Sequence, residues 1–159
     1  MDATKLLKTQ HAEAKGLFKK YESAKDSNQK QTLFEQIADA LAGHCTIEEK
    51  IFYPSVYVGP LADVLEDAVE EHLAAKRVIA DLLAMKAGDQ FDARMTVLQE
   101  QIEHHVEEEE GSLFPKVEKS FPAEELSAMG DRMKALFDEL EQGEPRMSVP
   151  GETGMAAPL

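Results

Sequence analysis

The sequence predicts an all-α fold, an up-down-up-down four-helix bundle with an additional C-terminal helix. Apolar residues recur at alternating steps of four and three, which is the spacing of a helix face that is turned toward a core. Runs of β-branched residues are missing, and the 159 residues include only nine Gly and seven Pro. The breaks between the periodic segments are short, so sequential helices are expected to lie antiparallel as neighbours.

Four periodic segments make up the predicted bundle, and in each a histidine takes a core-facing position that the pattern reserves for an apolar residue. The first segment carries Leu7, His11, Ala14, Phe18 and Tyr21 on one face. The second carries Ile37, Leu41, His44, Glu48 and Ile51. The third carries Leu61, Leu65, Ala68, His72, Ala75, Ile79 and Leu82, and the fourth carries Phe91, Met95, Leu98, Ile102, His105 and Glu109.

A fifth amphipathic helix is expected over residues 121–142. Pro122 lies near its first turn, where a proline fits because the amide groups of that turn have no partner inside the helix. The apolar side of this helix is formed by Leu126, Met129, Met133, Leu136 and Leu140. We expect this side to pack across the bundle.

The domain organisation follows from these segments. One bundle is expected over residues 1–142, built from two helical hairpins at 1–57 and 58–118 and from the fifth helix. The stretch 143–159, GEPRMSVPGETGMAAPL, contains Gly, Pro and small residues without periodicity. Because such a stretch buries little apolar surface to offset the entropy cost of ordering, we expect it to be a disordered tail.

The composition argues against several classes of partner. A formal net charge of −14 and a pI near 4.7 would repel nucleic acid and anionic membranes. No apolar run in the sequence approaches the roughly 18 to 20 residues that span a bilayer. Cys45 is the single cysteine, and the start MDATKLLKTQ lacks the apolar core of a signal sequence. We therefore expect a cytoplasmic protein with no nucleic-acid or membrane partner.

Two stretches share one sequence motif, a histidine four residues before a glutamate with an aromatic residue and a proline at the end. They are HCTIEEKIFYP from His44 and HVEEEEGSLFP from His105, and they lie at a fixed offset of 61 residues. The same offset relates HAEAK, which begins at His11, to HLAAK, which begins at His72. The chain therefore contains two copies of a helical hairpin, each with a histidine on its first helix and His-x-x-x-Glu on its second. The repeat gives six candidate metal ligands: His11, His44, Glu48, His72, His105 and Glu109.

A single buried histidine is usually a core residue that one hydrogen bond satisfies, but this set needs another explanation. Burying two carboxylates costs several kcal/mol each unless a positive charge compensates them. No core-facing position offers Lys or Arg, which leaves a bound cation. Residues four apart on a helix have Cβ atoms about 5 to 6 Å apart, so Glu48 and Glu109 can each share a cation with the histidine one turn earlier. Imidazole with carboxylate suits iron, zinc or manganese, and the absence of thiolates argues against structural zinc or iron–sulfur sites.

The number of donors favours two ions. Six protein ligands around one ion would leave no open position, whereas two ions that share both carboxylates fit the twofold repeat. Each octahedral ion has about six positions. Four ring nitrogens, two bridging carboxylates and a shared oxo or hydroxo group then leave about one open position on each ion. Dioxygen, peroxide or nitric oxide could bind there.

At these residues the chain resembles the hemerythrin-like family, also called the HHE cation-binding domain, from about residue 3 to residue 118. The motifs that carry the resemblance are His11, HCTIEEKIFYP with His44 and Glu48, EEH ending at His72, and HVEEEEGSLFP with His105 and Glu109. The resemblance implies a four-helix bundle with a non-haem di-iron site. In this family such a site serves oxygen carriage, oxygen or iron sensing, or the handling of peroxide and nitric oxide.

Two departures from the family's oxygen carriers argue against reversible oxygen carriage. Carriers have a second histidine four residues after the one on the third helix, where this chain has Lys76; and the fourth helix here has His-x-x-x-Glu instead of a histidine with a more distant aspartate. We therefore expect a protein that binds small oxidants and decomposes peroxide or nitric oxide, as a catalase-like or nitric-oxide-reducing oxidoreductase. The alternatives are an iron, oxygen or redox sensor without turnover, and a zinc or manganese site without a redox role.

Residues beside the candidate ligands carry further expectations. His104 also lies four residues before a glutamate, Glu108, but the periodicity and the offset both favour His105, which leaves His104 as a flanking residue. Three neighbouring carboxylates are expected on a solvated acidic face, with orientation of the histidines as the alternative. These are Glu49, Glu71 and Glu110.

Lysine, cysteine and aromatic neighbours are interpreted in the same way. Lys15 and Lys76 lie one turn after two of the histidines and are expected on the helix surface, with proton donation near the metal as the alternative. Cys45 lies about 100° round the helix from the histidine that precedes it, which predicts packing. Tyr53 and Phe114 each precede a proline, and we expect them to close the end of the bundle and stop the helices.

Overall fold

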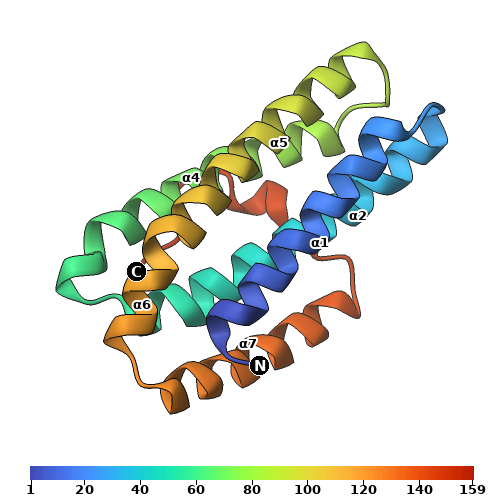
Figure 1. Ribbon diagram of the computed structural model, residues 1–159. Coiled ribbons are helices and arrows are strands. Elements are labelled where there is room, and N and C mark those ends of the chain that lie inside the picture. Colours follow the sequence, from blue (N-terminus) through green and yellow to red (C-terminus); the bar gives the residue numbers. More distant parts are fainter.

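Two antiparallel hairpins of long helices form the bundle (Figure 1). The computed structural model describes residues 1–159, except for the side chain of Asp89. α1 (Ala3–Ser23) packs on α2 (Ser27–Ile47), and α4 (Ala62–Leu83) packs on α5 (Asp89–Glu108). The described residues include no strand. The predicted all-α class and helical bundle are therefore confirmed.

Two aspartates begin the helices of the first hairpin. The side chain of Asp2 accepts a hydrogen bond from the backbone N–H of Lys5 at 3.0 Å, and that of Asp26 accepts one from Gln29 at 2.8 Å. Each bond satisfies an amide group that the first turn of a helix otherwise leaves without a partner. Residues 24–26 alone separate α1 from α2, so the two helices lie side by side.

α2 and α5 both continue into a π-helical turn that begins at a glutamate. The turns and the helices that follow them are Glu48–Phe52 with α3 (Tyr53–Val56) and Glu109–Leu113 with α6 (Phe114–Ser120). The π-helical bond joins a backbone N–H to the carbonyl five residues earlier, and the proline that follows stands in the first turn of the next helix, where it needs no donor. The chain therefore stays helical through Pro54 and Pro115, and the expectation that Tyr53 and Phe114 stop the helices is wrong.

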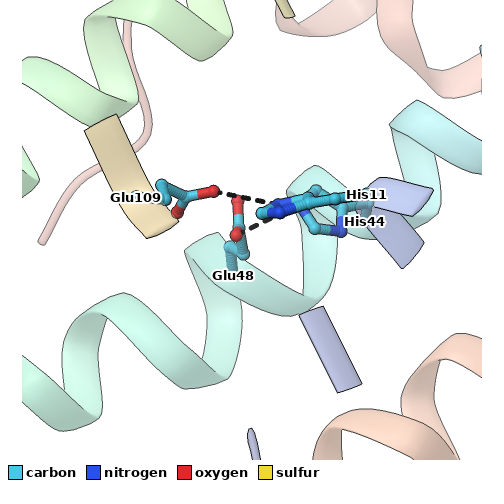
Figure 2. A group of neighbouring side chains, drawn as sticks. All are labelled: His11, His44, Glu48 and Glu109. Carbon is cyan, nitrogen blue, oxygen red and sulfur yellow. Dashed lines mark ion pairs between the residues drawn. The ribbon is translucent and has the colours of Figure 1, made fainter. Parts of the chain in front are cut away.

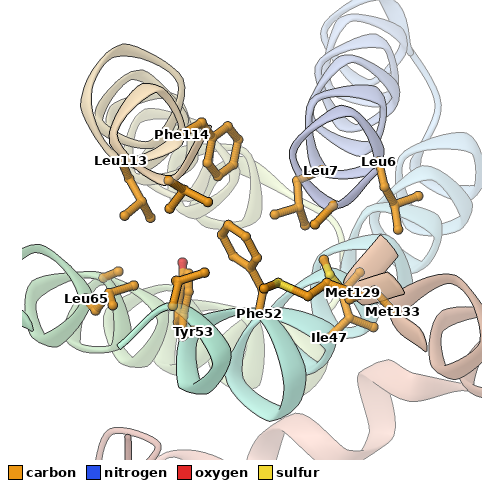
Figure 3. Packing of buried hydrophobic residues seen from close by; sticks show 14 of the residues in the cluster. Leu6, Leu7, Ile47, Phe52, Tyr53, Leu65, Leu113, Phe114, Met129 and Met133 are labelled. Atoms are coloured by element: carbon orange, nitrogen blue, oxygen red, sulfur yellow. The ribbon is translucent and has the colours of Figure 1, made fainter. Parts of the chain in front are cut away.

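Two apolar clusters fill the bundle on either side of a central polar layer. The first cluster includes Leu7, Ile47, Phe52, Leu113 and Phe114 (Figure 3). The second includes Ala14, Phe18, Leu41, Ala75 and Leu98. His11 lies between the two clusters on α1, and His44 lies between them on α2, so the layer that carries the histidines separates the clusters.

The additional C-terminal helix is α7 (Ala123–Glu141), which packs against α1 and α2 (Figure 1). Its Met129 and Met133 are buried in the first apolar cluster, where they lie close to Ile47 and Phe52 (Figure 3). A Cβ atom added at Gly130 would lie 2.1 Å from the carbonyl oxygen of Met1 and would also meet the backbone of residues 2 and 3. Only glycine lets α7 approach the start of α1 this closely.

The segment after α7 is ordered, contrary to the expectation of a disordered tail over residues 143–159. A 3₁₀ helix, Pro145–Glu152, packs against both α2 and α4. Val149 is 2% exposed, and Arg146 donates to Asp39 of α2 from its backbone N–H at 3.0 Å and from its guanidinium at 2.8 Å. Sequence periodicity does not detect this segment, because isolated buried residues and charged pairs with distant parts of the chain hold it instead of a repeated apolar pattern.

Replacing Gly130 by alanine is predicted to destabilise the protein. A glycine-to-alanine change inside a helix normally stabilises by roughly 0.5–1 kcal/mol. At Gly130 the added methyl group would meet backbone atoms that cannot rotate away, and such overpacking costs about 1–3 kcal/mol. Gly16 of α1 is the matched control because a Cβ there meets nothing within 4 Å. Urea unfolding should show lower stability for Gly130→Ala and slightly higher stability for Gly16→Ala; equal stabilisation of both would contradict this packing.

Candidate metal centre

The six candidate ligands meet in the central polar layer, and all are buried. They are His11 of α1, His44 of α2, His72 of α4, His105 of α5, and Glu48 and Glu109 at the first positions of the two π-helical turns. The carboxylate-bearing residues Glu48 and Glu109 are 0% and 2% exposed. Figure 2 shows both carboxylates with His11 and His44, and the four side chains point toward one another.

Each carboxylate lies between a histidine of the first hairpin and a histidine of the second. The short contacts between Nε2 and a carboxylate oxygen are His44–Glu48 at 3.1 Å, His72–Glu48 at 3.0 Å, His11–Glu109 at 3.2 Å and His105–Glu109 at 3.2 Å. Glu48 uses one oxygen for each of its contacts, whereas Glu109 uses Oε1 for both. The two glutamates therefore connect the hairpins across the bundle axis.

An acceptor outside this layer holds the other ring nitrogen, Nδ1, of every histidine. The pairs are His11 with Glu110 at 2.8 Å, His44 with Gln10 at 2.7 Å, His72 with Glu49 at 2.7 Å and His105 with Glu71 at 2.7 Å. An ionised carboxylate or an amide oxygen only accepts, so Nδ1 carries the hydrogen, and in a neutral ring Nε2 turns its lone pair inward. Glu49, Glu71 and Glu110 thus orient histidines, and the expectation that they serve only as a solvated face is wrong.

Four of the inward-facing atoms lack a hydrogen-bond partner within the chain. Nε2 of His11 and of His44, and one oxygen each of Glu48 and Glu109, are buried without a hydrogen bond although they lie close together. Nε2 and oxygen lie 3.2 Å apart in the His11–Glu109 pair and 3.1 Å apart in the His44–Glu48 pair, yet no hydrogen bond joins them. Nitrogen lone pairs repel carboxylate oxygens at such distances, and a cation between them makes both contacts favourable.

The donor atoms form two overlapping groups that could hold an ion. Within each group, one atom from every residue lies within 4.8 Å of the others. The groups are His11, His44, Glu48 and Glu109, and Glu48, His72 and His105. Imidazole nitrogens supply half or more of the donors in each group, and this mixture suits iron, zinc or manganese better than calcium or magnesium.

The charges at the centre shift the pKa values of its members. Burial by itself would lower the pKa of His105, but the carboxylates of Glu109, Glu48 and Glu71 raise it well above its usual range. Burial would raise the pKa of Glu48, but His44 and the histidines of the second hairpin hold it well below its usual range. The raised pKa values of His11, His72 and His105 favour the protonated form of these rings when no metal is bound, and metal binding must displace such protons.

Tyr53 is a member of this centre that sequence reasoning missed. Its side chain is fully buried, and its hydroxyl lies 3.0 Å from Glu48 Oε2 and 2.8 Å from Glu109 Oε2. The same oxygen lies 3.3 Å from Nε2 of both His72 and His105. Burial and the two nearby carboxylates raise the pKa of Tyr53 well above its usual range, which keeps its proton in place. The sequence contains one indication of this role. The equivalent position in the second half of the 61-residue repeat is a phenylalanine, so the two halves differ by one hydroxyl group at this place.

A small enclosed cavity lies beside the histidine rings. Its volume is ≈ 20 Å³, which is about the space of one water molecule. All four histidines line it together with the apolar side chains of Ala14, Leu41, Ala75, Ile102 and Val106. Cys45 also borders this cavity and is buried, in agreement with its expected packing role. A polar centre with an apolar pocket of this size accepts only ligands of a few atoms.

The two grooves between the hairpins differ. The groove between α1 and α5 is open and reaches His11 and Glu110. At the equivalent place between α2 and α4 lies the 3₁₀ helix Pro145–Glu152. The lysines of the repeat reflect this difference, because Lys15 is exposed as expected whereas Lys76 is buried.

Two side chains beside the ligands occupy different environments. Lys76 donates to Glu49 at 2.8 Å and to Glu152 of the C-terminal segment at 3.0 Å, so its expected surface position is wrong. The His104 side chain is 63% exposed and lies 3.2 Å from Glu108, outside the central layer. The structure thus places His104 on the flank of α5, as predicted.

The bundle and its buried histidine–carboxylate centre define a class of helical proteins that bind a cation between two hairpins. Residues 2–117 match the family described as the Hemerythrin HHE cation binding domain, and the chain belongs to this family. The resemblance stated from the sequence is therefore confirmed. No helix in the described part of the chain combines the length and apolar character that crossing a membrane requires.

Individual relatives and one solved structure are similar to the chain. The chain is 26% identical over 151 residues to a Mycobacterium tuberculosis protein named Uncharacterized protein Rv2633c, a match that covers 91% of this chain and 90% of that protein. It is 23% identical over 143 residues to a Nostoc sp. protein named DNA nickase, of which it spans only 41%. The crystal structure of the Rv2633c homolog from Mycobacterium kansasii, an HHE cation binding domain-containing protein, aligns with a TM-score of 0.80 and 23% identity. That alignment covers 89% of this chain and 88% of the other, and it shows a shared fold.

The metal-free protein is predicted to lose stability as the pH rises above neutrality. Because the folded-state pKa values of His72 and His105 are raised, their protonated forms stabilise the fold fully below the ordinary histidine pKa of 6.5. That contribution disappears as the pH passes through the raised values. Urea unfolding of chelator-treated protein should therefore show a lower free energy of unfolding at pH 9 than at pH 6.5. Zinc-saturated protein is the control and should change much less; a metal-free protein that gains stability over this range would contradict the charge balance.

Proposed function

We propose that the protein is a hemerythrin-like non-haem di-iron protein that binds dioxygen, hydrogen peroxide or nitric oxide and decomposes peroxide or nitric oxide. The observation that carries the proposal is the convergence of four ring nitrogens and two buried carboxylates, to which no described lysine or arginine is paired. The residues that would hold the ions are His11, His44, Glu48, His72, His105 and Glu109. When bound, a pair of irons supplies electron exchange with small oxidants, which zinc cannot supply.

The two overlapping donor groups support two ions over one. Glu48 belongs to both groups, and its two oxygens face histidines of different hairpins, as a bridging carboxylate requires. Glu109 also faces histidines of both hairpins, His11 and His105, but it does so with one oxygen, Oε1. The four outer acceptors on Nδ1 fix the ring orientations, so the donor atoms are in place before an ion arrives.

The size of the cavity supports a small ligand. Its ≈ 20 Å³ volume beside the histidines excludes organic substrates and leaves room for a molecule of two to four atoms. Ala14, Leu41 and Ala75 belong to the apolar wall and keep water away from the histidines. The open groove between α1 and α5 provides the nearest solvent-exposed route to this centre, because it reaches His11.

The tyrosine beside the carboxylates holds a hydrogen-bond donor at a defined place. The Tyr53 hydroxyl donates toward Glu48 or Glu109, and it is the one phenol in contact with the described ligand atoms. Its raised pKa keeps this proton on the oxygen, so the hydroxyl holds the two carboxylates in place by hydrogen bonding and does not lose the proton to them.

A sensor without turnover is the second candidate function, and one chain of contacts favours it. His72 bonds Glu49, Glu49 bonds Lys76, and Lys76 bonds Glu152 of the C-terminal 3₁₀ helix. Loss of metal would change the charge of His72, and this connection can pass that change to a surface segment. The activity named for the Nostoc relative concerns a longer protein, and a net charge of −14 disfavours binding of this chain to nucleic acid.

Metal content and peroxide consumption test the proposal and separate the two functions. Protein purified from iron-replete cells should contain about two irons per chain, and it should evolve oxygen rapidly from hydrogen peroxide or consume nitric oxide. His105→Ala should lose iron and abolish turnover, because Nε2 of His105 faces the shared carboxylates. The neighbouring exposed residue offers a matched control, since His104→Ala should keep both properties.

The other outcomes are equally informative. Two irons without consumption of any of these oxidants, together with melting of the bundle on iron removal, would replace the enzyme by the sensor. One zinc per chain and no redox activity would reject the di-iron proposal.

A further inference from the structure

The 61-residue repeat relates the outer partners of the histidines as well as the histidines themselves. The equivalent pairs of the first and second halves are Glu110–His11 with Glu49–His72, and Gln10–His44 with Glu71–His105. The first equivalence preserves the chemistry, since both partners are carboxylates. The second does not, because the neutral amide of Gln10 stands where the other half has the carboxylate of Glu71.

Charged side chains around the outer partners do not cancel the difference between Gln10 and Glu71. In the second half the ammonium of Lys76 lies between two carboxylates, Glu49 at 2.8 Å and Glu152 at 3.0 Å, so it offsets one of them. Glu71 adds a further carboxylate to that half, and the exposed Glu108 and His104 lie beside it. In the first half, Glu110 is the charged outer partner of the histidines. Two carboxylates therefore bond the histidines of the second half at Nδ1, whereas one carboxylate and one amide bond those of the first half.

A carboxylate that accepts the Nδ1 hydrogen makes the ring a stronger donor through Nε2, because the negative charge stabilises positive charge on the imidazole. Each central carboxylate contacts one histidine of each half, so the outer partners are the groups that belong to one half alone. The donor group with His11 and His44 includes both carboxylates and the group with His72 and His105 only Glu48, so the outer partners have to outweigh this difference in number. We propose that the two metal positions are unequal, with the ion between His72 and His105 bound more tightly than the ion between His11 and His44, and that Glu71 and Gln10 are the positioning residues that set the order. This inference rests on the two-ion site proposed above.

The weaker position also lies closer to solvent. His11 and Glu110 border the open groove between α1 and α5, whereas the C-terminal 3₁₀ helix covers the equivalent groove beside His72. The ion between His11 and His44 is thus both less strongly held and better exposed. It is the ion that exchanges, while the other stays with the fold.

Stepwise titration of the metal-free full chain with Zn²⁺ tests the order of binding. Calorimetry gives the number of ions and the affinity of each step, and zinc adds no absorption of its own. The buried Tyr53 reports the position, because its hydroxyl lies 3.3 Å from Nε2 of both His72 and His105 and none of its hydrogen bonds reaches His11 or His44. Since the hydroxyl also contacts both central carboxylates, His72→Ala provides the check and should remove the tight step while the weak step remains. The near-ultraviolet tyrosine absorption should change mainly with the first equivalent, and Tyr53→Phe should remove that change.

Reciprocal exchange of the outer partners provides the decisive variants. Glu71→Gln should weaken the tight step by roughly 10- to 100-fold, and Gln10→Glu should strengthen the weak step by a similar factor. In the double variant the order should invert, so that the Tyr53 signal appears with the second equivalent. Structural damage could lower both affinities, but it could not raise the weak one or reverse the order.

The outcomes separate this inference from the proposed function. Binding of a single zinc ion would reject the two-ion site itself. Two ions that bind with equal affinity, or two unequal steps whose order the exchanges leave unchanged, would keep the two-ion site and overturn the inequality.

Discussion

The structure depends on the burial of two carboxylates without a cationic side chain. Glu48 and Glu109 lie at the centre of the bundle, and neither forms an ion pair with any described lysine or arginine. Ionised groups in such a place cost several kcal/mol each unless opposite charge compensates them. The chain supplies four imidazoles, whose lone pairs cannot provide that charge while the rings are neutral. The compensation must be protons on the histidines or metal ions between them, and the unpaired geometry of the central atoms favours the ions.

Several features of the fold follow from this requirement. Both π-helical turns begin at the carboxylate residues, and π turns are frequent at functional sites because the extra residue changes the direction of the side chains that follow. The turn after Glu48 brings Tyr53 into the centre, whereas the turn after Glu109 brings Phe114 into the first apolar cluster. Apolar clusters on both sides isolate the polar layer from water. The repeat thus builds a twofold frame, and single substitutions within it make the two halves chemically different.

Much of this arrangement can be predicted from the sequence, because helical periodicity and the 61-residue offset can both be read from the order of residues along the chain. They identify the core-facing histidines and glutamates and the hairpins that carry them. Tyr53 was missed because a tyrosine before a proline usually ends a helix, and the π-helical turn that keeps the helix going has no simple sequence pattern.

The remaining differences come from contacts between distant parts of the chain. Lys76 is buried because Glu152, 76 residues later in the sequence, covers it, and the C-terminal segment is ordered by Val149 and by the pairing of Arg146 with Asp39. Periodicity within a segment contains no information about such partners. The orientation of the histidines by glutamates adjacent to the ligands required the same three-dimensional information.

We propose that two metal ions lie between the histidines and balance the two buried carboxylates. Anomalous diffraction from crystals of the iron-loaded protein, recorded on both sides of the iron absorption edge, can locate these ions. We expect two iron peaks next to Glu48 and Glu109, one beside His11 and His44 and the other beside His72 and His105. A single peak, or a centre without iron in which protonated histidines bond directly to the carboxylates, would contradict it.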